Sequence, residues 1–201
     1  MKLYYSPGAC SLAAHIALLE EGCSFDLERV DLKRKVTETG KDFTLLNSKG
    51  YVPALVLDDG SMVTENIAVL DWITIQYPTL GIEGERGRTR LIEALAYIST
   101  EIHKSFKPFW HGAVETDKAE AGLLIIRRLN WLGARMAGTY LFGDRPTVAD
   151  FYLFVTLRWA ERFGIKIPQA LAMLKRRIES RPEVRAAIAF EETPALMAGN
   201  A

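Results

Sequence analysis

The order of structure types in the first 78 residues constrains the fold more than any other feature of this sequence. Residues 2–6 form a β-favouring run, residues 10–22 carry apolar side chains at helical spacing with Gly22 as the expected C′ residue, and residues 24–32 alternate like a half-buried strand. In a strand–helix–strand unit the two strands are parallel and the crossover is right-handed. The chain is therefore expected to begin with an α/β domain.

A hairpin and a further helix follow this unit. Residues 33–50 are polar and are expected to be irregular. Residues 52–65 predict a β-hairpin with its turn at Asp58-Asp59-Gly60. Residues 66–78 have helical apolar spacing, which completes a first domain expected at residues 1–78.

Beyond residue 78 the pattern is helical almost throughout. Residues 79–87 are rich in glycine and charge and are expected to form a linker, followed by an all-helical domain at residues 88–201. The helices of this domain are predicted at 88–112, 116–138, 147–163, 168–180 and 182–191. Thr147 and Asp150 fit the N-cap and third position of a capping box. The expected fold class is α/β plus all-α.

Composition narrows the classes of function. The chain has 201 residues, 49% of them hydrophobic and 25% charged, as in an ordinary soluble globular protein. Its formal charge is zero, which gives no support for a nucleic-acid partner. The start lacks the apolar region of a signal peptide, and no apolar run has the length of a membrane span. Two cysteines make no disulfide framework, so a reduced, cytoplasmic location is expected.

Cys10 is the first candidate for chemistry, because it stands where the predicted strand turns into a helix. The positive end of a helix dipole stabilises a thiolate, so we expect Cys10 to have a lowered pKa. Packing as a small hydrophobe is the alternative, and it is the interpretation favoured for Cys23. A dithiol oxidoreductase would have a second cysteine where this chain has Ala13. Any partner thiol must therefore come from another molecule.

Two further features admit a functional interpretation. Val52-Pro53 precedes a predicted strand, where an X–Pro bond can be cis, although these residues alone favour a trans, strand-initiating proline. Glu65 can hold an ammonium group, and the N–H groups from Asn66 onward can hold a carboxylate. This pair suits the end of an α-amino acid, and a plain helix N-cap with a solvated Glu65 is equally compatible with it.

The histidines give no metal-ligand spacing with a third ligand, so no metal is expected. His15 lies on the first predicted helix and is expected to be structural. His103 lies in the middle of a later predicted helix, where it can face the first domain.

Several segments together resemble a bacterial β-class glutathione S-transferase over nearly the whole chain. They are KLYYSPGACSLAAHIAL, LNSKGYVPALVLDDG, VTEN, EIHK and GDRPTVADFYLF. The resemblance implies an N-terminal thioredoxin-like domain, a C-terminal helical-bundle domain and a homodimer. It also supplies the external thiol, because glutathione is the co-substrate of this family.

The resemblance further implies roles for individual residues. Cys10 lies beside the glutathione sulfur and can form a mixed disulfide with it, Ser11 follows at the helix start, and His103 approaches the thiol. The residues implied in glutathione binding are Tyr5, Cys10, Lys35, Val52, cis Pro53, Glu65, Asn66, Thr100 and His103. The family often has Asn where this chain has Ala96, whose side chain makes no hydrogen bond.

The function implied is conjugation of the glutathione thiol to hydrophobic electrophilic small molecules, as in detoxification. A second, glutathione-dependent thiol–disulfide activity through Cys10 is implied with it. The alternative from another class is a non-catalytic glutathione-transferase-like binding or interaction module. The intact set of Cys10, Val52-Pro53, Glu65-Asn66 and His103 argues against that alternative.

Overall fold

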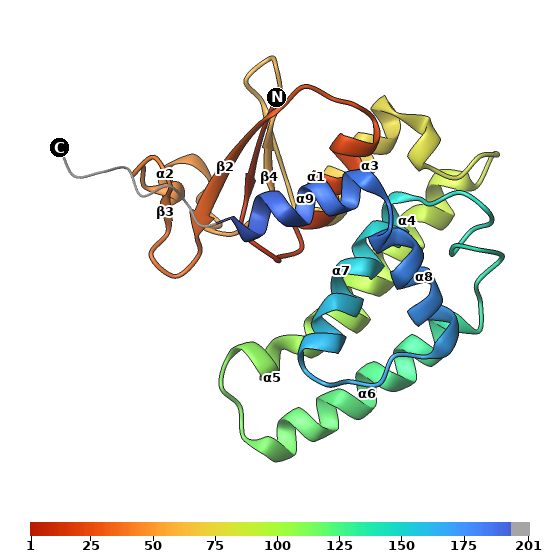
Figure 1. The fold of residues 1–201 in the computed structure, drawn as a ribbon. Helices are drawn as coiled ribbons and strands as arrows, with labels where there is room; N and C mark the ends of the chain where they lie inside the picture. The colour runs from red at the N-terminus through yellow and green to blue at the C-terminus, as the bar shows by residue number, and fades with distance from the viewer. Residues whose placement is uncertain (194–201) are drawn as a thin grey trace. The chain divides into compact units, whose positions relative to one another are not determined.

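The computed structural model describes residues 1–193, and it divides into two compact units (Figure 1). The first unit comprises residues 1–73 together with the helix that starts at Pro182, and the second comprises residues 74–181. The last helix therefore belongs to the same compact unit as the N-terminal sheet. The domain limits expected from the sequence, 1–78 and 88–201, stay predictions, and residues 194–201 lie outside the described part.

One sheet organises the first unit. Its strands are β1 (Lys2–Tyr5), β2 (Asp26–Asp31), β3 (Val36–Thr37), β4 (Ala54–Val56) and β5 (Met62–Thr64). Their order in the sheet is β3-β2-β1-β4-β5. β1 pairs with β2 in parallel, whereas β1 with β4 and β4 with β5 are antiparallel. The predicted parallel pair and the predicted hairpin are both confirmed.

The helices of the first unit connect and cover these strands. They are α1 (Leu12–Glu20), α2 (Phe43–Leu46), α3 (Asn66–Gln76), which continues into the second unit, and α9 (Pro182–Glu192). α1 is the crossover between β1 and β2, and Gly22 after it has a φ of 62°, as a C′ glycine requires. α9 lies alongside α1 (Figure 1).

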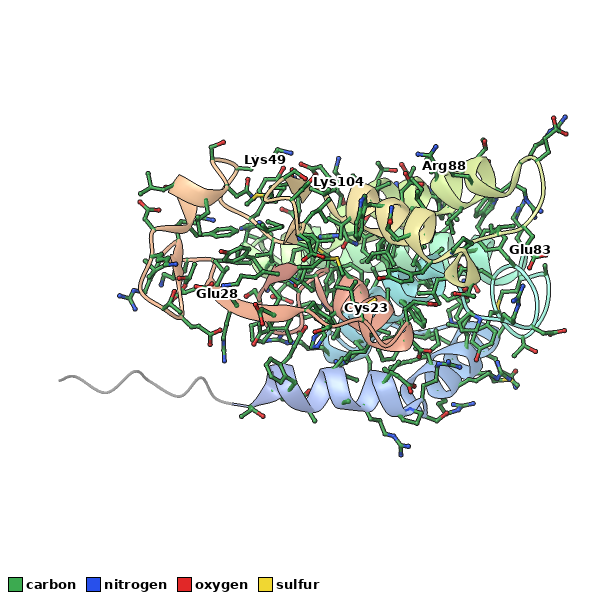
Figure 2. All side chains as sticks on the ribbon, turned by 90° about the horizontal axis from the view of Figure 1, so that it is seen from above. Cys23, Glu28, Lys49, Glu83, Arg88 and Lys104 are labelled. Carbon is green, nitrogen blue, oxygen red and sulfur yellow. The ribbon has the colours of Figure 1, made fainter. Side chains whose placement is uncertain are left out.

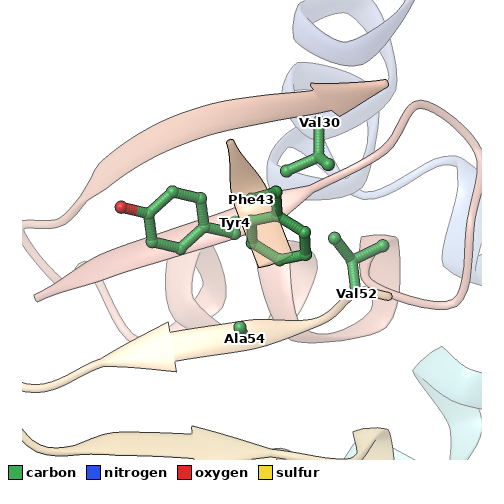
Figure 3. Packing of buried hydrophobic residues seen from close by; sticks show 5 residues of the cluster. All are labelled: Tyr4, Val30, Phe43, Val52 and Ala54. Atoms are coloured by element: carbon green, nitrogen blue, oxygen red, sulfur yellow. The ribbon is translucent and has the colours of Figure 1, made fainter. Parts of the chain in front are cut away.

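The segment 33–50 is not irregular throughout, as the sequence predicted, because it contains β3 and α2. The reason is Phe43, which is fully buried and packs against Tyr4 with ring centroids 5.5 Å apart. Figure 3 shows Phe43 among Tyr4, Val30, Val52 and Ala54, the apolar cluster to which it belongs. Burial of one large aromatic side chain thus holds a helix of a single turn against the sheet.

The second unit is helical. Its elements are the 3₁₀ turn η1 (Pro78–Leu80), α4 (Gly87–Tyr97), the π-helical η2 (Ile98–Ile102), the 3₁₀ turn η3 (His103–Phe106), α5 (Lys107–Trp110), α6 (Glu115–Gly133), α7 (Val148–Arg162) and α8 (Gln169–Glu179). α7 is buried at nearly every position between Val148 and Ala160, so it forms the centre of this unit. Among residues 1–193, no helix combines the length and apolar character needed to cross a bilayer.

The single helix predicted at 88–112 is wrong, because the chain forms four successive helical segments there. α4 passes into the π-helical η2, then into η3 and α5. Pro108 has no N–H to donate to the Lys104 carbonyl in an α-helical ladder. Further up the segment, the Ser105 hydroxyl donates to the Glu101 carbonyl at 2.8 Å. π-helical turns inside helices often lie at functional sites, and this one directly precedes His103.

The capping box of α7 is confirmed. Thr147 is the N-cap residue, and its backbone N–H and its hydroxyl each donate to Oδ2 of Asp150 at 2.8 Å. The N–H of Leu141 donates to the other carboxylate oxygen, also at 2.8 Å. Burial raises the pKa of Asp150 to about 6, although these hydrogen bonds oppose the rise. The box thus joins the start of α7 to the preceding loop.

Replacing Thr147 with Ala removes the hydroxyl that helps to satisfy the buried Asp150 carboxylate. We expect Thr147→Ala to lower the free energy of unfolding by about 1 kcal/mol, the usual cost of losing an N-cap side chain. Urea denaturation measures the change. The matched control is Thr116→Ala on the exposed face of α6, which should stay within about 0.5 kcal/mol of the parent. Equal stability of the two variants would contradict this role.

Candidate active site

The strand register of the first unit brings several predicted site residues to one edge of the sheet. Ala54, the first residue of β4, pairs with Tyr4 near the end of β1 and with Thr64 at the end of β5. The loop after β1, the start of β4 and the end of β5 therefore lie at the same edge. The predicted residues at these three places are Cys10 and Ser11, Val52 and Pro53, and Glu65 and Asn66.

Cys10 and Val52 are in direct contact. The Cys10 Sγ lies 3.6 Å from the Val52 carbonyl oxygen, within the range of a thiol hydrogen bond. The Val52-Pro53 peptide bond is cis. The family resemblance predicted this isomer, whereas the trans proline favoured by the local residues alone is wrong.

The surroundings of Cys10 oppose the thiolate expected there, which stays a prediction. Burial raises the pKa of the Cys10 thiol to about 12, while the N–H groups of Cys10 and Ser11 lower it and the Glu65 charge raises it further. α1 begins only at Leu12, two residues beyond the cysteine. The desolvation cost of a buried thiolate thus exceeds the stabilisation by the helix start. A pKa raised in this way favours the protonated thiol at neutral pH, which can donate to the Val52 carbonyl.

Ser11 and Tyr5 are buried on either side of the loop that carries Cys10. The Ser11 hydroxyl lies 3.3 Å from the Ser6 nitrogen and 3.4 Å from the Ser6 carbonyl oxygen, so it closes the loop on itself. Burial raises the pKa of Tyr5 to about 12, with smaller contributions from nearby carboxylates. Tyr5 is therefore a neutral phenol at physiological pH. The ligand-binding roles of both side chains stay predictions.

Glu65 presents its carboxylate at the end of β5. Its Oε1 accepts hydrogen bonds from Lys49 Nζ and from the Tyr51 hydroxyl, each at 2.6 Å. Lys49 reaches it from the loop before β4 (labelled in Figure 2). Glu65 has a φ of 71°, in the left-handed region that a non-glycine residue adopts at a cost of about 1–3 kcal/mol. Such backbone outliers cluster at ligand sites.

Asn66 follows as the first residue of α3 and is buried. Neither its side-chain nitrogen nor its side-chain oxygen has a hydrogen-bond partner in the described part of the protein. A buried polar group without a partner costs about 1–3 kcal/mol. Both side-chain groups of Asn66 are therefore available to a ligand.

Lys35 belongs to the loop after β2, whose end lies at the same edge because β2 is parallel to β1. Its ammonium donates to the Gly50 carbonyl at 2.6 Å. Gly50 stands two residues before Val52. Lys35 thus reaches the segment that leads into the cis peptide.

Thr100 and His103 belong to the second unit and are described within it. The Thr100 hydroxyl donates to the carbonyl of Ala96 (2.9 Å). The His103 Nδ1 lies 2.6 Å from the Tyr152 hydroxyl, and its ring meets Trp159 edge-on at 4.8 Å between centroids. Their roles toward a ligand stay predictions.

The environment of His103 keeps its imidazole neutral. Burial lowers the pKa of His103 to about 4, and the charges of Lys104 and Lys107 lower it further. A neutral imidazole that is fixed by one hydrogen bond has the protonation state of a proton acceptor.

Sequence reasoning missed Lys49 and Tyr51, although both lie in the segment quoted for the family resemblance. Their contact with Glu65 spans the whole β4–β5 hairpin, so it depends on strand register and not on local spacing. Within residues 1–193, no group of three or more His, Cys, Asp or Glu side chains is arranged to hold a metal ion.

Comparison with known proteins decides the family. Residues 8–74 match the family model of the glutathione S-transferase N-terminal domain, and residues 124–189 match that of its C-terminal domain. The chain is 38% identical to the glutathione S-transferase GstA of Escherichia coli O157:H7 over 95% of this chain and 98% of the relative. The chain belongs to the glutathione S-transferase family. The predicted fold, a thioredoxin-like domain with a helical domain, is thereby confirmed.

Solved structures of bacterial glutathione S-transferases have the same fold as this chain. A sphingomonad glutathione S-transferase in complex with glutathione has a TM-score of 0.89 and 40% identity, covering 96% of this chain and 100% of that one. The β-class enzyme of Sphingomonas chungbukensis has a TM-score of 0.86 and 40% identity, covering 96% and 99%. The resemblance to the bacterial β class is thus confirmed, and so is the prediction of a transferase. The alternative of a non-catalytic module is not favoured.

The lowered pKa of His103 predicts a pH-dependent stability. Between about pH 4 and about pH 6.5 the unfolded chain binds a proton at His103 that the folded chain does not. Stability should therefore fall as the pH drops through this window. We expect the urea midpoint of the parent to fall more steeply from pH 7.5 to pH 5 than that of His103→Gln. Thr116→Ala, at an exposed position of α6 without a titratable group, supplies the control and should keep the parental slope; a common slope for all three proteins would contradict the neutral imidazole.

Proposed function

We propose that the glutathione-binding site of this transferase lies at the sheet edge of the first unit, and that the enzyme conjugates the bound thiol to hydrophobic electrophiles. The buried Asn66 amide without a partner is the observation that carries the proposal. It stands next to Glu65, so an acceptor for an ammonium group adjoins donors for a carboxylate. A γ-glutamyl end carries both charges on one carbon.

The remaining groups of the edge suit the rest of a short peptide. Val52 offers backbone groups beside the cis proline for pairing with the cysteinyl unit. Lys35 offers an ammonium for the glycine carboxylate. In the free protein Glu65 is bound to Lys49 and Tyr51, so the incoming ammonium joins or replaces these donors. The solved sphingomonad relative contains glutathione, which supports the choice of peptide.

The chemistry follows from which sulfur is ionised. In conjugation the sulfur of glutathione is the nucleophile, and it reacts as a thiolate. In the free protein the protonated Cys10 thiol faces the Val52 carbonyl; when glutathione binds, its one S–H turns to donate to the glutathione thiolate instead. Ser11, at the N-cap of α1, contributes a helix start that favours negative charge. His103 and Thr100 enter through the family resemblance, and the neutral imidazole suits acceptance of the thiol proton.

Thiol transfer is the secondary activity. Cys10 loses its proton and attacks one sulfur of a glutathione disulfide, which forms the mixed disulfide and releases the other half as a thiolate. The raised pKa leaves little Cys10 thiolate at pH 7, so this reaction should be slow there.

The finer parts of the assignment rest on the family. We infer a homodimer, a cytoplasmic location and a role in detoxification from the similarity to bacterial β-class enzymes. The electrophile is expected to be hydrophobic.

Removing the charge of Glu65 tests the binding site. We expect Glu65→Gln to weaken glutathione binding by about tenfold, since a charge-assisted hydrogen bond contributes about 1.5–3 kcal/mol and this side chain is half exposed. Isothermal titration calorimetry measures the affinity. The control Glu85→Gln removes the same charge from an exposed position in the second unit and should bind like the parent. Parental affinity in Glu65→Gln would refute the site.

Replacing Cys10 separates the two activities. Cys10→Ala should lower conjugation by only about fivefold, the effect of one hydrogen bond worth about 1 kcal/mol, and should abolish the adduct with oxidised glutathione. Mass spectrometry should find this adduct on the parent slowly at pH 7 and faster as the pH rises above 9. Cys23→Ala, which alters the other cysteine of the chain, should behave as the parent. Rapid adduct formation at pH 7 would show that the thiol is ionised.

A further inference from the structure

A buried carboxylate near the end of the described chain is hydrogen-bonded to the loop that carries Cys10. Glu191 lies in the last turn of α9 and is 3% exposed. Its Oε2 accepts the N–H of Gly8 at 2.8 Å, and its Oε1 lies 3.0 Å from Nδ1 of His15. Gly8 belongs to the loop between β1 and α1, and His15 lies on α1. One carboxylate thus joins the loop to the helix that follows it.

The residue beside Glu191 reinforces this contact. The ring of Phe190 lies 6.1 Å from that of Tyr5 and 5.8 Å from that of His15, measured between centroids. Tyr5 ends β1, so Phe190 contacts the element before the loop and the element after it. α9 therefore fixes both ends of the loop as well as its middle.

The loop itself has little regular structure to hold it. Gly8 has a φ of 66°, and the Ala9 N–H donates to the Ser6 carbonyl at 3.0 Å, which makes a tight turn. The Ser11 hydroxyl adds a second contact with Ser6. Both of these contacts are internal to the loop and the start of α1, so they shape the turn but do not tie it to another element. Glu191 makes such an external contact.

A buried pair of this kind is costly if its only role is stability. Burying a carboxylate and an imidazole removes both from water, and apolar side chains of similar size often serve stability as well or better. Neither Glu191 nor His15 has a part in the chemistry proposed above. The burial of Glu191 and His15 is explained if the pair holds the loop between β1 and α1 in place.

We propose that Glu191 is a positioning residue, which fixes the turn at Gly8 and thereby holds the Cys10 thiol against the Val52 carbonyl. The consequence for conjugation rests on the proposed role of Cys10 as a hydrogen-bond donor. The consequence for the thiol does not depend on that role. The contact of the Cys10 Sγ with the Val52 carbonyl at 3.6 Å is consistent with a loop held in one place.

The test compares the two cysteines of the same chain. The parent, Glu191→Ala and Glu191→Gln are treated with iodoacetamide at pH 8, and peptide mass spectrometry follows alkylation of Cys10 and of Cys23. Cys23 lies just past the opposite end of α1 (labelled in Figure 2) and reports on general loosening. The matched control is Glu192→Ala, which removes the same charge from the next, exposed residue of α9.

Release of the loop should expose Cys10 alone. In Glu191→Ala we expect at least a tenfold faster alkylation of Cys10, with the rate at Cys23 and both rates in Glu192→Ala within twofold of the parent. Glu191→Gln keeps an oxygen for the Gly8 N–H and should show a smaller increase, about threefold. If Glu191→Ala does not fold, the Cys10 alkylation rate of Glu191→Gln is compared with that of Glu192→Gln, and a faster rate in Glu191→Gln alone supports the proposal. An unchanged rate at Cys10, or an equal rise at both cysteines, would overturn the proposal.

Steady-state kinetics supply the second readout. Glu191→Ala should lower kcat for conjugation by several-fold and leave the Kd for glutathione within twofold, because Glu65 and Asn66 are untouched. A parental kcat together with faster alkylation would refute the donor role of Cys10 and leave the positioning role standing. Loss of glutathione affinity with no change at Cys10 would overturn the positioning role.

Discussion

The register of β4 between β1 and β5 is the constraint on which the site depends. Ala54 and Leu55 of β4 are both fully buried, as is Leu3 of β1, so both faces of the sheet are packed. A slip of one residue would exchange a methyl group for a leucine side chain on each face, and close-packed interiors do not tolerate such a change. Size, and not only polarity, thus fixes the pairing. The cis peptide directly precedes β4, and Glu65 directly follows β5. Because the register between β4 and β5 is fixed, these two features lie at the same edge of the sheet.

At Cys10 the expected effect of a helix start on the pKa of the thiol is outweighed by the effect of burial. A helix start lowers the pKa of a thiol, and the N–H groups of Cys10 and Ser11 do act in that direction. Each pKa unit corresponds to about 1.4 kcal/mol, and the cost of dehydrating a buried thiolate is larger than what two N–H groups return. The donor role proposed for this cysteine therefore differs from the nucleophile that the sequence alone predicted.

The sequence predicted those features that depend on neighbouring residues. The strand–helix–strand unit, the hairpin turn at Gly60 and the capping box at Thr147 each have a signal within a few positions. Features that depend on distant residues were not predicted. α2 forms because Phe43 packs on Tyr4, and Lys49 reaches Glu65 across a hairpin. For the site, the candidate residues came from local motifs and the family resemblance, whereas their common sheet edge, their pKa values and their hydrogen-bond partners required the fold.

The buried polar groups of the first unit differ in how they are satisfied, and the difference separates framework from binding surface. Glu28 is bound by Lys2 and Thr39, and Glu191 by Gly8 and His15 (Glu28 is labelled in Figure 2). Across residues 1–193, the buried side-chain nitrogen and oxygen atoms that lack a partner both belong to Asn66. Folded proteins leave few such groups, because each costs about 1–3 kcal/mol. A carboxylate that is fully satisfied within the protein holds the framework in place, whereas the Asn66 amide, without a partner in the described residues, is the group that the proposed glutathione site would complete.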